Sequence, residues 1–243
     1  MLQSQHQARH VPASHWHRRV LPQLGAMVLC LSSHLTWAAC SDAPAAAVDW
    51  TQCEKARLLL RNATLTGARL AGADFSGTDL QGAKLSGADL THGSVDRARL
   101  SGADLSRAKL VQLNSYRANF KGANLSGADL TKAELFRANL STANLSGANL
   151  RKAELQRAIL EGANLNGANL TGADMARANL VNAKMDGVRL AQTRMFRTRL
   201  EGVDLSRSVG LVATQLDIAC GDARTRLPEG FKAPKSWPCS KDD

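Results

Sequence analysis

The sequence predicts a solenoid, a rod built from short repeated units, and two counts lead to this fold class. From Leu60 to Leu205 every fifth position is apolar with one exception: 23 of the 30 positions are Leu, and Ser115 is polar. Alanine stands two residues before this position in 22 of the 30 units. Nearly all charged residues fall on the other three positions of the unit.

A period of five fits neither a regular helix nor a regular strand. On an α-helix, residues five apart are rotated by about 140° from each other, so the leucines would form no stripe. On a strand, odd spacing places successive leucines on opposite faces. The chain must therefore turn once per unit, so that every fifth residue points back to one axis, as in repeat architectures.

The units resemble one known family. Segments such as Ala88-Asp89-Leu90, Ala103-Asp104-Leu105-Ser106, Ala123-Asn124-Leu125-Ser126-Gly127 and Ala163-Asn164-Leu165-Asn166-Gly167 are typical of pentapeptide-repeat proteins. The resemblance implies an all-β fold, a right-handed quadrilateral β-helix in which four units form one coil, with the Leu and Ala positions pointing inward. At about 4.8 Å per coil, 30 units would form about 7.5 coils and a rod roughly 36 Å long, with short caps at both ends.

The turn positions lead to two further expectations. Glycine often lies two residues after the Leu, as at Gly67 and Gly127, where a type II turn requires a positive φ. One corner carries Arg instead of Gly, so we predict that its turns are not type II. In the unit Val111–Ser115, Leu113 stands where Ala is usual and Ser115 where Leu is usual. This indicates either local repacking, with Leu113 filling the space that Ser115 leaves, or a hinge or recognition bulge. The unit around His92 also matches the repeat pattern poorly.

The chain divides into four predicted segments. Residues 1–39 are expected to be a signal peptide, with basic residues at His17-Arg18-Arg19, an apolar stretch over 20–35 and small residues at Ala38-Ala39. The stretch is interrupted and shorter than the roughly 20 apolar residues of a membrane anchor, and it fits a twin-arginine signal poorly. Residues 40–57 are predicted to be a tether and N-terminal cap, residues 58–207 the β-helix, and residues 208–243 a C-terminal cap.

Four cysteines follow the predicted signal. Trp37-Ala38-Ala39-Cys40 resembles a bacterial lipobox, which implies lipidation at Cys40; the alternative is cleavage after Ala38 or within Ala45–Ala47. Cys220 and Cys239 are predicted to form a disulfide that closes the C-terminal cap, worth about 3 kcal/mol in the loop-entropy model. Cys53 pairs with Cys40 or stays unpaired.

Charge and the scarcity of catalytic residue types restrict the function classes. The formal net charge is +10, and residues 56–209 hold 22 basic and 13 acidic residues. Family members that protect gyrase have acidic rods resembling DNA, which a basic rod does not. His92 is the one histidine after residue 39, and no nucleophile, zinc or phosphate-loop motif occurs. We therefore expect no enzyme, no cofactor and no metal site, and we interpret Glu134 and Glu154 as members of an ion-paired surface ladder.

One exterior column stands out. Arginine recurs every twenty residues, at Arg97, Arg117, Arg137, Arg157, Arg177 and Arg197, and three of these follow Tyr116, Phe136 and Phe196. At about 4.8 Å, neighbouring guanidiniums repel by about 1 kcal/mol in water, and we expect Glu134, Glu154 and Asp174 to offset part of this. The column is either a partner-binding face for anions or the product of coil duplication with simply solvated charges.

These observations favour a non-enzymatic, exported interaction or scaffold module, periplasmic or anchored in the envelope by a lipid on Cys40. Its partner would be a protein or an anionic envelope component that binds the Arg/aromatic column, and homodimers are compatible with the fold. No small-molecule substrate is expected, and nucleic acid is disfavoured. The alternatives are a cytoplasmic gyrase- or nucleic-acid-directed protein, by family analogy alone, and a structural spacer with no specific ligand.

Overall fold

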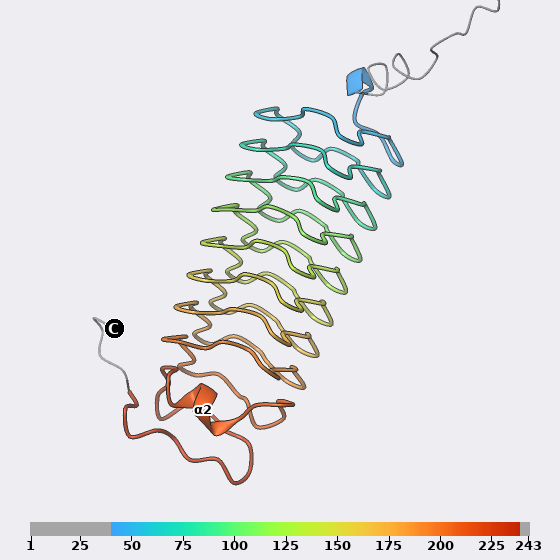
Figure 1. Cartoon of the computed structure of the whole chain (residues 1–243). Coiled ribbons are helices and arrows are strands. Elements are labelled where there is room, and N and C mark those ends of the chain that lie inside the picture. Colours follow the sequence, from blue (N-terminus) through green and yellow to red (C-terminus); the bar gives the residue numbers. More distant parts are fainter. Residues whose placement is uncertain (1–39, 239–243) are drawn as a thin grey trace, which may run out of the picture.

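The computed structural model describes residues 40–238 and shows a four-sided coil stacked on itself along one axis (Figure 1). Parallel β-bridges join residues twenty apart without interruption from Asp49–Arg69 to Asn179–Arg199. Each bridge is a single residue pair between two turns. The predicted signal peptide, residues 1–39, and Cys239 lie outside the described residues.

Backbone hydrogen bonds stack the coils, as the unit around Leu85 illustrates. The N–H of Leu85 donates to the carbonyl of Asp104 at 2.7 Å, and the N–H of Asp89 donates back to Ala68 at 2.9 Å. The N–H of Ala88 donates to the carbonyl of Leu85 at 3.0 Å and closes the corner. These bonds satisfy polar backbone groups between coils, so the interior can be filled by apolar side chains.

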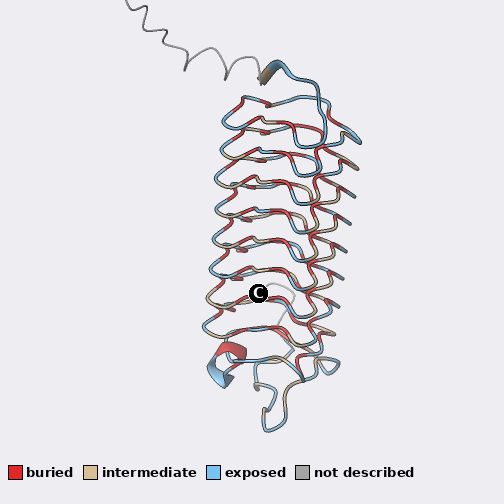
Figure 2. Cartoon of the chain, turned by 90° about the vertical axis from the view of Figure 1, so that its right-hand side faces the viewer, coloured by how far each residue is buried: buried red, intermediate tan, exposed pale blue. Residues whose placement is uncertain are grey.

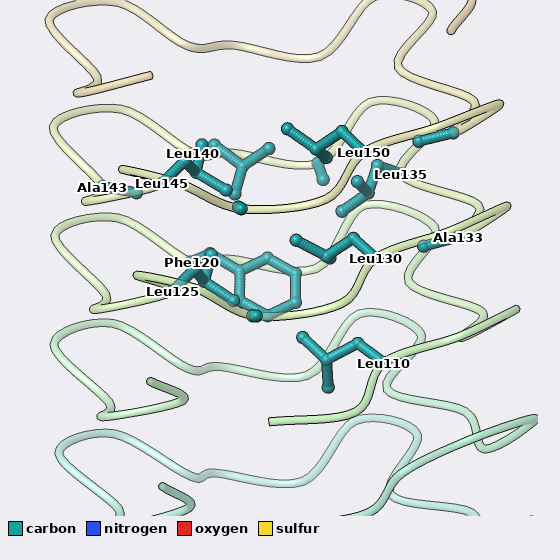
Figure 3. Close-up of a cluster of buried hydrophobic side chains, with 14 of the residues drawn as sticks. Leu110, Phe120, Leu125, Leu130, Ala133, Leu135, Leu140, Ala143, Leu145 and Leu150 are labelled. Atoms are coloured by element: carbon teal, nitrogen blue, oxygen red, sulfur yellow. The ribbon is translucent and has the colours of Figure 1, made fainter. Parts of the chain in front are cut away.

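The core is the predicted double column of Leu and Ala. From Leu65 to Leu205, the Leu positions are 0–1 % exposed, and most of the Ala positions are equally buried (Figure 2). Side chains such as Leu110, Leu130 and Leu150 lie in successive coils above one another (Figure 3). Where Thr replaces Ala, its hydroxyl is satisfied internally: Thr198 Oγ1 donates to the carbonyl of Met175 at 2.7 Å.

The unit with exchanged residues is a local repacking. Leu113 and Ser115 are both 0 % exposed, and Ser115 Oγ donates to the carbonyl of Glu134 at 2.8 Å. The bridges from Asn114 to Ser94 and to Glu134 are intact. The coil therefore continues through this unit with no hinge or bulge.

The coil geometry begins earlier than the predicted boundary at residue 58. Trp50 and Lys55 occupy inward positions and are 1 % and 7 % exposed. Lys55 Nζ donates a hydrogen bond to the carbonyl of Cys40 and lies 3.8 Å from the centroid of the Trp50 ring. Burial lowers the pKa of Lys55, and the carboxylate of Asp42 acts in the opposite direction. Residues assigned to the tether and cap thus form part of the first coil.

The C-terminal end is closed by helix α2, Ala213–Leu216, and the segment after it (Figure 1). Gln215 Nε2 donates to the carbonyls of Leu190 at 2.9 Å and Thr193 at 2.8 Å, and Trp237 Nε1 donates to Ala219 at 2.8 Å. These side chains bind backbone groups at the end of the coil, as a cap must. Within residues 40–238, no helix has the length and apolar character needed to cross a bilayer.

Candidate interaction face

The six arginines at residues 97–197 form one edge of the rod, here called the Arg ladder. Each follows an inward residue by two positions, so all occupy the same corner of successive coils. The backbone N–H of a ladder arginine donates to the carbonyl of the residue that precedes the next arginine: Arg117 donates to Phe136 at 3.1 Å, and Arg157 donates to Ala176 at 2.9 Å. The register of the stack therefore fixes the ladder at a spacing of about 4.8 Å.

The ladder residues adopt a left-handed backbone conformation, so the prediction that their turns are not type II was wrong. Their φ values lie between 52° for Arg197 and 59° for Arg157, close to the 64° of Gly67. The stacking hydrogen bonds impose one corner geometry on all residue types. Because a side chain at positive φ costs about 1 kcal/mol relative to Gly, the chain carries these arginines at the expense of stability.

Aromatic rings support the guanidiniums. Tyr116 has Arg97 at 5.9 Å and Arg117 at 5.1 Å from its ring centroid, and Arg137 lies 5.4 Å from Phe136. Arg177 and Arg197 lie 6.0 and 5.6 Å from the ring of Phe196, which is 47 % exposed. Each of these distances is within the range of cation–π attraction. The structure thus brings all three predicted aromatic residues together with the ladder.

The expectation that acidic neighbours neutralise part of the charge of the ladder is wrong. In the described part of the chain, Arg97, Arg117, Arg137, Arg157 and Arg177 form no ion pair within 4.0 Å with any carboxylate. Asp174 pairs with Arg194 at 3.1 Å and accepts from Gln156 Nε2 at 3.1 Å instead. Glu134 and Glu154 are exposed and likewise form no ion pair among these residues, so they are no ion-paired ladder. The ladder therefore presents net positive charge to solvent.

The Arg column continues beyond the ladder, which sequence reasoning missed. Arg57 lies on the same corner, and Gly77 interrupts the column between Arg57 and Arg97. The surface is hollowed there, with a volume of ≈ 570 Å³, and Arg57, Gly77, Arg97 and Tyr116 are among the lining residues. The twenty-residue spacing of Arg57, Gly77 and Arg97 was the available signal, but the coil was assumed to start after Arg57.

The cysteines are placed as follows. Cys40 and Cys53 form a disulfide, with Cα atoms 5.5 Å apart, so the paired alternative for Cys53 holds. A sulfur in a disulfide cannot carry a thioether-linked lipid, so this bridge and lipidation of Cys40 exclude each other. Cys220 is disulfide-bonded. Because Cys40 and Cys53 pair with each other, the partner of Cys220 lies outside the described residues. The predicted partner, Cys239, also lies outside them.

No other cluster in the described part of the chain suggests chemistry. Residues 40–238 contain no group of three or more His, Cys, Asp or Glu side chains arranged to hold a metal ion. His92 is exposed on a corner with a φ of 58°. The candidate site is therefore the outer surface formed by the Arg ladder and the rings of Tyr116, Phe136 and Phe196.

Comparison with known proteins agrees with the geometry. The family model for pentapeptide repeats matches in eight copies over residues 59–92, 98–135, 133–172 and 173–209. The chain therefore belongs to the pentapeptide-repeat family, and its fold is the right-handed quadrilateral β-helix. No curated protein sequence matches it.

Several solved structures are similar. HetL, a pentapeptide-repeat protein involved in heterocyst differentiation regulation in Nostoc sp. PCC 7120, is 28 % identical, with 76 % of this chain and 91 % of HetL covered and a TM-score of 0.39. QnrB1, a plasmid-mediated fluoroquinolone resistance protein, is 22 % identical, with coverages of 72 % and 90 % and a TM-score of 0.42. A protein of the Arabidopsis thaliana thylakoid lumen is 30 % identical, with coverages of 42 % and 68 % and a TM-score of 0.32.

Proposed function

We propose that this protein is a non-catalytic interaction module that binds an anionic partner along the Arg ladder. One observation carries the proposal: arginines occupy the same corner of six successive coils at positive φ, without carboxylate partners for at least five of them. Glycine fills many other corners of the rod, where it avoids the conformational cost. Another corner also carries non-glycine residues at positive φ, at His92, Gln112, Lys132 and Lys152, but their types differ. The repetition of one charged residue type through six coils is better explained by binding than by folding.

The neighbouring rings suit this role. A guanidinium held against an aromatic face keeps its donors free for a carboxylate or phosphate, and it loses less conformational entropy when a partner binds. Arg beside Tyr and Phe is also the composition of binding hot spots. The bridges place the arginines one coil apart at equal intervals, so a partner with several regularly spaced anionic groups matches the ladder best.

We further propose that the rod acts outside the cytoplasm, as the signal-like residues 1–39 suggest. The disulfide between Cys40 and Cys53 supports this proposal, because disulfides persist mainly in oxidising compartments. The intact mass of the mature protein from fractionated cells tests it. A cleaved chain with intact bridges in the envelope fraction is expected, and a full-length reduced chain in the cytosol would contradict it.

The binding test compares two variants of equal charge. In the ladder variant, Arg117, Arg137, Arg157 and Arg177 are replaced by Gln. In the control variant, Arg107, Lys132, Arg151 and Lys152, all exposed and located on other corners, are replaced by Gln. Each protein is applied to immobilised heparin, used as a defined polyanion, and eluted with increasing salt.

The ladder variant is expected to elute at clearly lower salt than the wild type, because arginines on one edge can contact one polyanion together, and each contact releases counterions. The control variant should elute near the wild type. Equal shifts for both variants would mean that binding follows net charge alone, and the proposal would fail. The same pair can then be used to recover partners from envelope extracts, where a true partner is lost only with the ladder variant.

A further inference from the structure

The hollow at Gly77 adjoins the first residue of the ladder, Arg97, and differs from the ladder in charge. It is open to solvent and has a volume of ≈ 570 Å³ at the corner where the Arg column lacks one member. Side chains of positive and of negative charge line the hollow, whereas the ladder consists of arginines alone. The side chains that matter are Arg57, Asp74, Ser76, Asp96, Arg97 and Tyr116.

Each of the two carboxylates in the hollow is oriented by hydrogen bonds to one of its two oxygens. Asp74 Oδ1 accepts hydrogen bonds from the N–H of Ser76 at 2.8 Å and from the Ser76 hydroxyl. Asp96 Oδ1 accepts from the N–H of Tyr116 at 2.8 Å. Within residues 40–238, Oδ2 of neither residue has a hydrogen-bond partner. Each carboxylate is thus fixed in place with one oxygen available for a ligand.

The two guanidiniums are also available. Neither Arg57 nor Arg97 is within 4.0 Å of a carboxylate in the described part of the chain, although Asp74 and Asp96 line the same hollow. Arg97 is held beside the Tyr116 ring at 5.9 Å. Arg57 and Arg97 lie two coils apart, or about 9.6 Å along the rod axis. Two cations and two anions therefore line one concave space without forming an ion pair within 4.0 Å.

We propose that this hollow binds a small zwitterionic group, in which a primary ammonium and a phosphate or carboxylate lie a few bonds apart. The anionic group would bridge Arg57 and Arg97, and the ammonium would donate to the free oxygens of Asp74 and Asp96. Charge-assisted hydrogen bonds of this kind are the stronger ones in proteins. A purely anionic ligand is disfavoured by the two carboxylates, and a purely cationic ligand by the two guanidiniums.

Gly77 is what keeps the space open. A Cβ at this position would meet Arg57 Cγ at 3.5 Å, an ordinary contact, so the surroundings leave room for a side chain, and the positive φ of 67° adds a cost of about 1 kcal/mol. The seven other residues of the column, Arg57 and the six arginines of the ladder, have φ values of 52° to 60°. The variant Gly77→Arg should therefore fold, complete the column and fill the hollow.

A matched control exists on another corner. Gly127 has a φ of 64°, and a Cβ there would meet Arg107 Cγ at 3.6 Å. The variant Gly127→Arg thus adds the same side chain, in the same backbone conformation, above an arginine twenty residues earlier. Any general effect of added charge or strain should appear in both variants.

The probe is O-phosphoethanolamine, which carries both groups, titrated calorimetrically into the full mature protein. Saturable binding is expected for the wild type and for Gly127→Arg, with a loss of at least about tenfold in affinity for Gly77→Arg, the size of one charged hydrogen bond. Absence of saturable binding to the wild type, or equal losses in the two variants, would overturn the proposal.

A second variant tests the ammonium half of the site without blocking it. Asn can replace Asp as acceptor at both positions. Asn124 Oδ1 accepts from the N–H of Ser126 at 3.2 Å, as Asp74 does within its turn, and Asn166 Oδ1 accepts from the N–H of Asp186 at 2.9 Å, as Asp96 does between coils. The double variant Asp74→Asn, Asp96→Asn should therefore keep its turns but bind O-phosphoethanolamine about tenfold more weakly. Its affinity for inorganic phosphate should stay equal or rise. A parallel loss for both probes would contradict a zwitterion site.

The zwitterion could be a lipid headgroup or a free solute, and vesicles distinguish these sources. Binding to phosphatidylcholine vesicles that contain phosphatidylethanolamine, but not to phosphatidylcholine alone, assigns the headgroup; binding only to soluble O-phosphoethanolamine assigns a free solute. The site does not depend on the ladder function. Replacing Arg137, Arg157 and Arg177 by Gln leaves the hollow intact, so failure of polyanion binding and failure of zwitterion binding are measured separately.

Discussion

The ring of Tyr116 stacks on the ring of Phe136, with centroids 5.8 Å apart and planes inclined by 7°. The two residues are twenty positions apart, so the stack exists because consecutive coils are in register. Arg117 and Arg137 lie beside these rings at 5.1 and 5.4 Å. The stack therefore holds two neighbouring cations of the ladder in a fixed relative position.

The exchanged pair Leu113 and Ser115 should behave as one packing unit. Leu113→Ala is expected to lower the free energy of unfolding by about 2–5 kcal/mol because it leaves a cavity, and Ser115→Leu by about 1–3 kcal/mol because the space is already filled. The double variant should recover to within about 1 kcal/mol of the wild type, since the volumes then match again. Urea unfolding measures all four proteins. Additive losses in the double variant would show that the two side chains do not share the space.

A chain of side-chain amides should stabilise the contacts between coils. Asn144 Nδ2 donates to Asn124 Oδ1 at 3.2 Å, and Asn164 Nδ2 donates to Asn144 Oδ1 at 3.2 Å. Asn144 also accepts from the N–H of Ser146 at 3.2 Å. Asn144→Ala is expected to lower the free energy of unfolding by about 1–3 kcal/mol, because partly buried partners lose their bonds.

The control for this prediction is Asn139→Ala. Asn139 accepts hydrogen bonds from the N–H and hydroxyl of Ser141, within its own turn. Its removal should cost less than that of Asn144, and the difference measures the amide bonds between coils. Equal losses for the two variants would assign the whole effect to the turns.

The bridge between Cys40 and Cys53 should stabilise the first coil. It closes a loop with a sequence separation of 13, for which loop entropy predicts roughly 3 kcal/mol. Reduction is expected to expose the first coil to hydrogen exchange while the middle of the rod stays protected, because each coil contacts only its neighbours. The variant Cys53→Ser should show the same exchange pattern without reductant. A uniform loss of protection along the rod would contradict local stabilisation.

Acid should weaken the contact between the first two coils. Hydrogen bonds from Thr51, followed by those from Arg69, lower the pKa of Asp49 to about 2, against roughly 3.9 in an unfolded chain. A carboxyl whose folded pKa is depressed contributes stability above its unfolded pKa and loses it as the pH falls through the folded value. Stability should therefore fall from about pH 4 to about pH 2.

The variant Asp49→Asn provides the comparison, because Asn still accepts from the N–H of Thr51 but does not titrate. Its urea midpoint should change less between pH 4 and pH 2 than that of the wild type. Identical pH profiles would mean that Asp49 contributes nothing measurable over this range.

The interior of the fold could be predicted from sequence because one side-chain type repeats at one spacing. Leucine at every fifth position leaves a single geometry in which all are buried, and the structure has that geometry from Leu65 to Leu205. The start of the coil was missed for the same reason. Trp50 and Lys55 occupy inward positions without being Leu, and Lys55 is tolerated there because the carbonyl of Cys40 and the Trp50 ring satisfy its ammonium.

The candidate site was only partly predictable. Position within the unit was enough to identify the Arg ladder, but not the backbone conformation at Arg137 and Arg157, because stacking between distant residues overrides local preference. Nor was the partner of Asp174 predictable: its neighbours in sequence suggested Arg177, whereas the bridge to the next coil brings Arg194. Contacts between coils depend on side-chain directions that spacing alone does not give.

The strict twenty-residue register of the bridges determines which changes in chain length the rod accommodates. Removing residues 138–157 would join Arg137 to Ala158 and shorten the molecule by one coil. Every remaining side chain would still face the same side of the rod. Removing five residues instead would rotate all that follows by a quarter turn, and the arginines beyond the deletion would face a different side from those before it. Both proteins should retain their β-helical circular dichroism, but only the first should keep one continuous ladder, as salt elution from heparin would reveal. The length of the rod can therefore change in steps of twenty residues while its arginines stay on one edge, and a change of any other length divides the ladder between two sides.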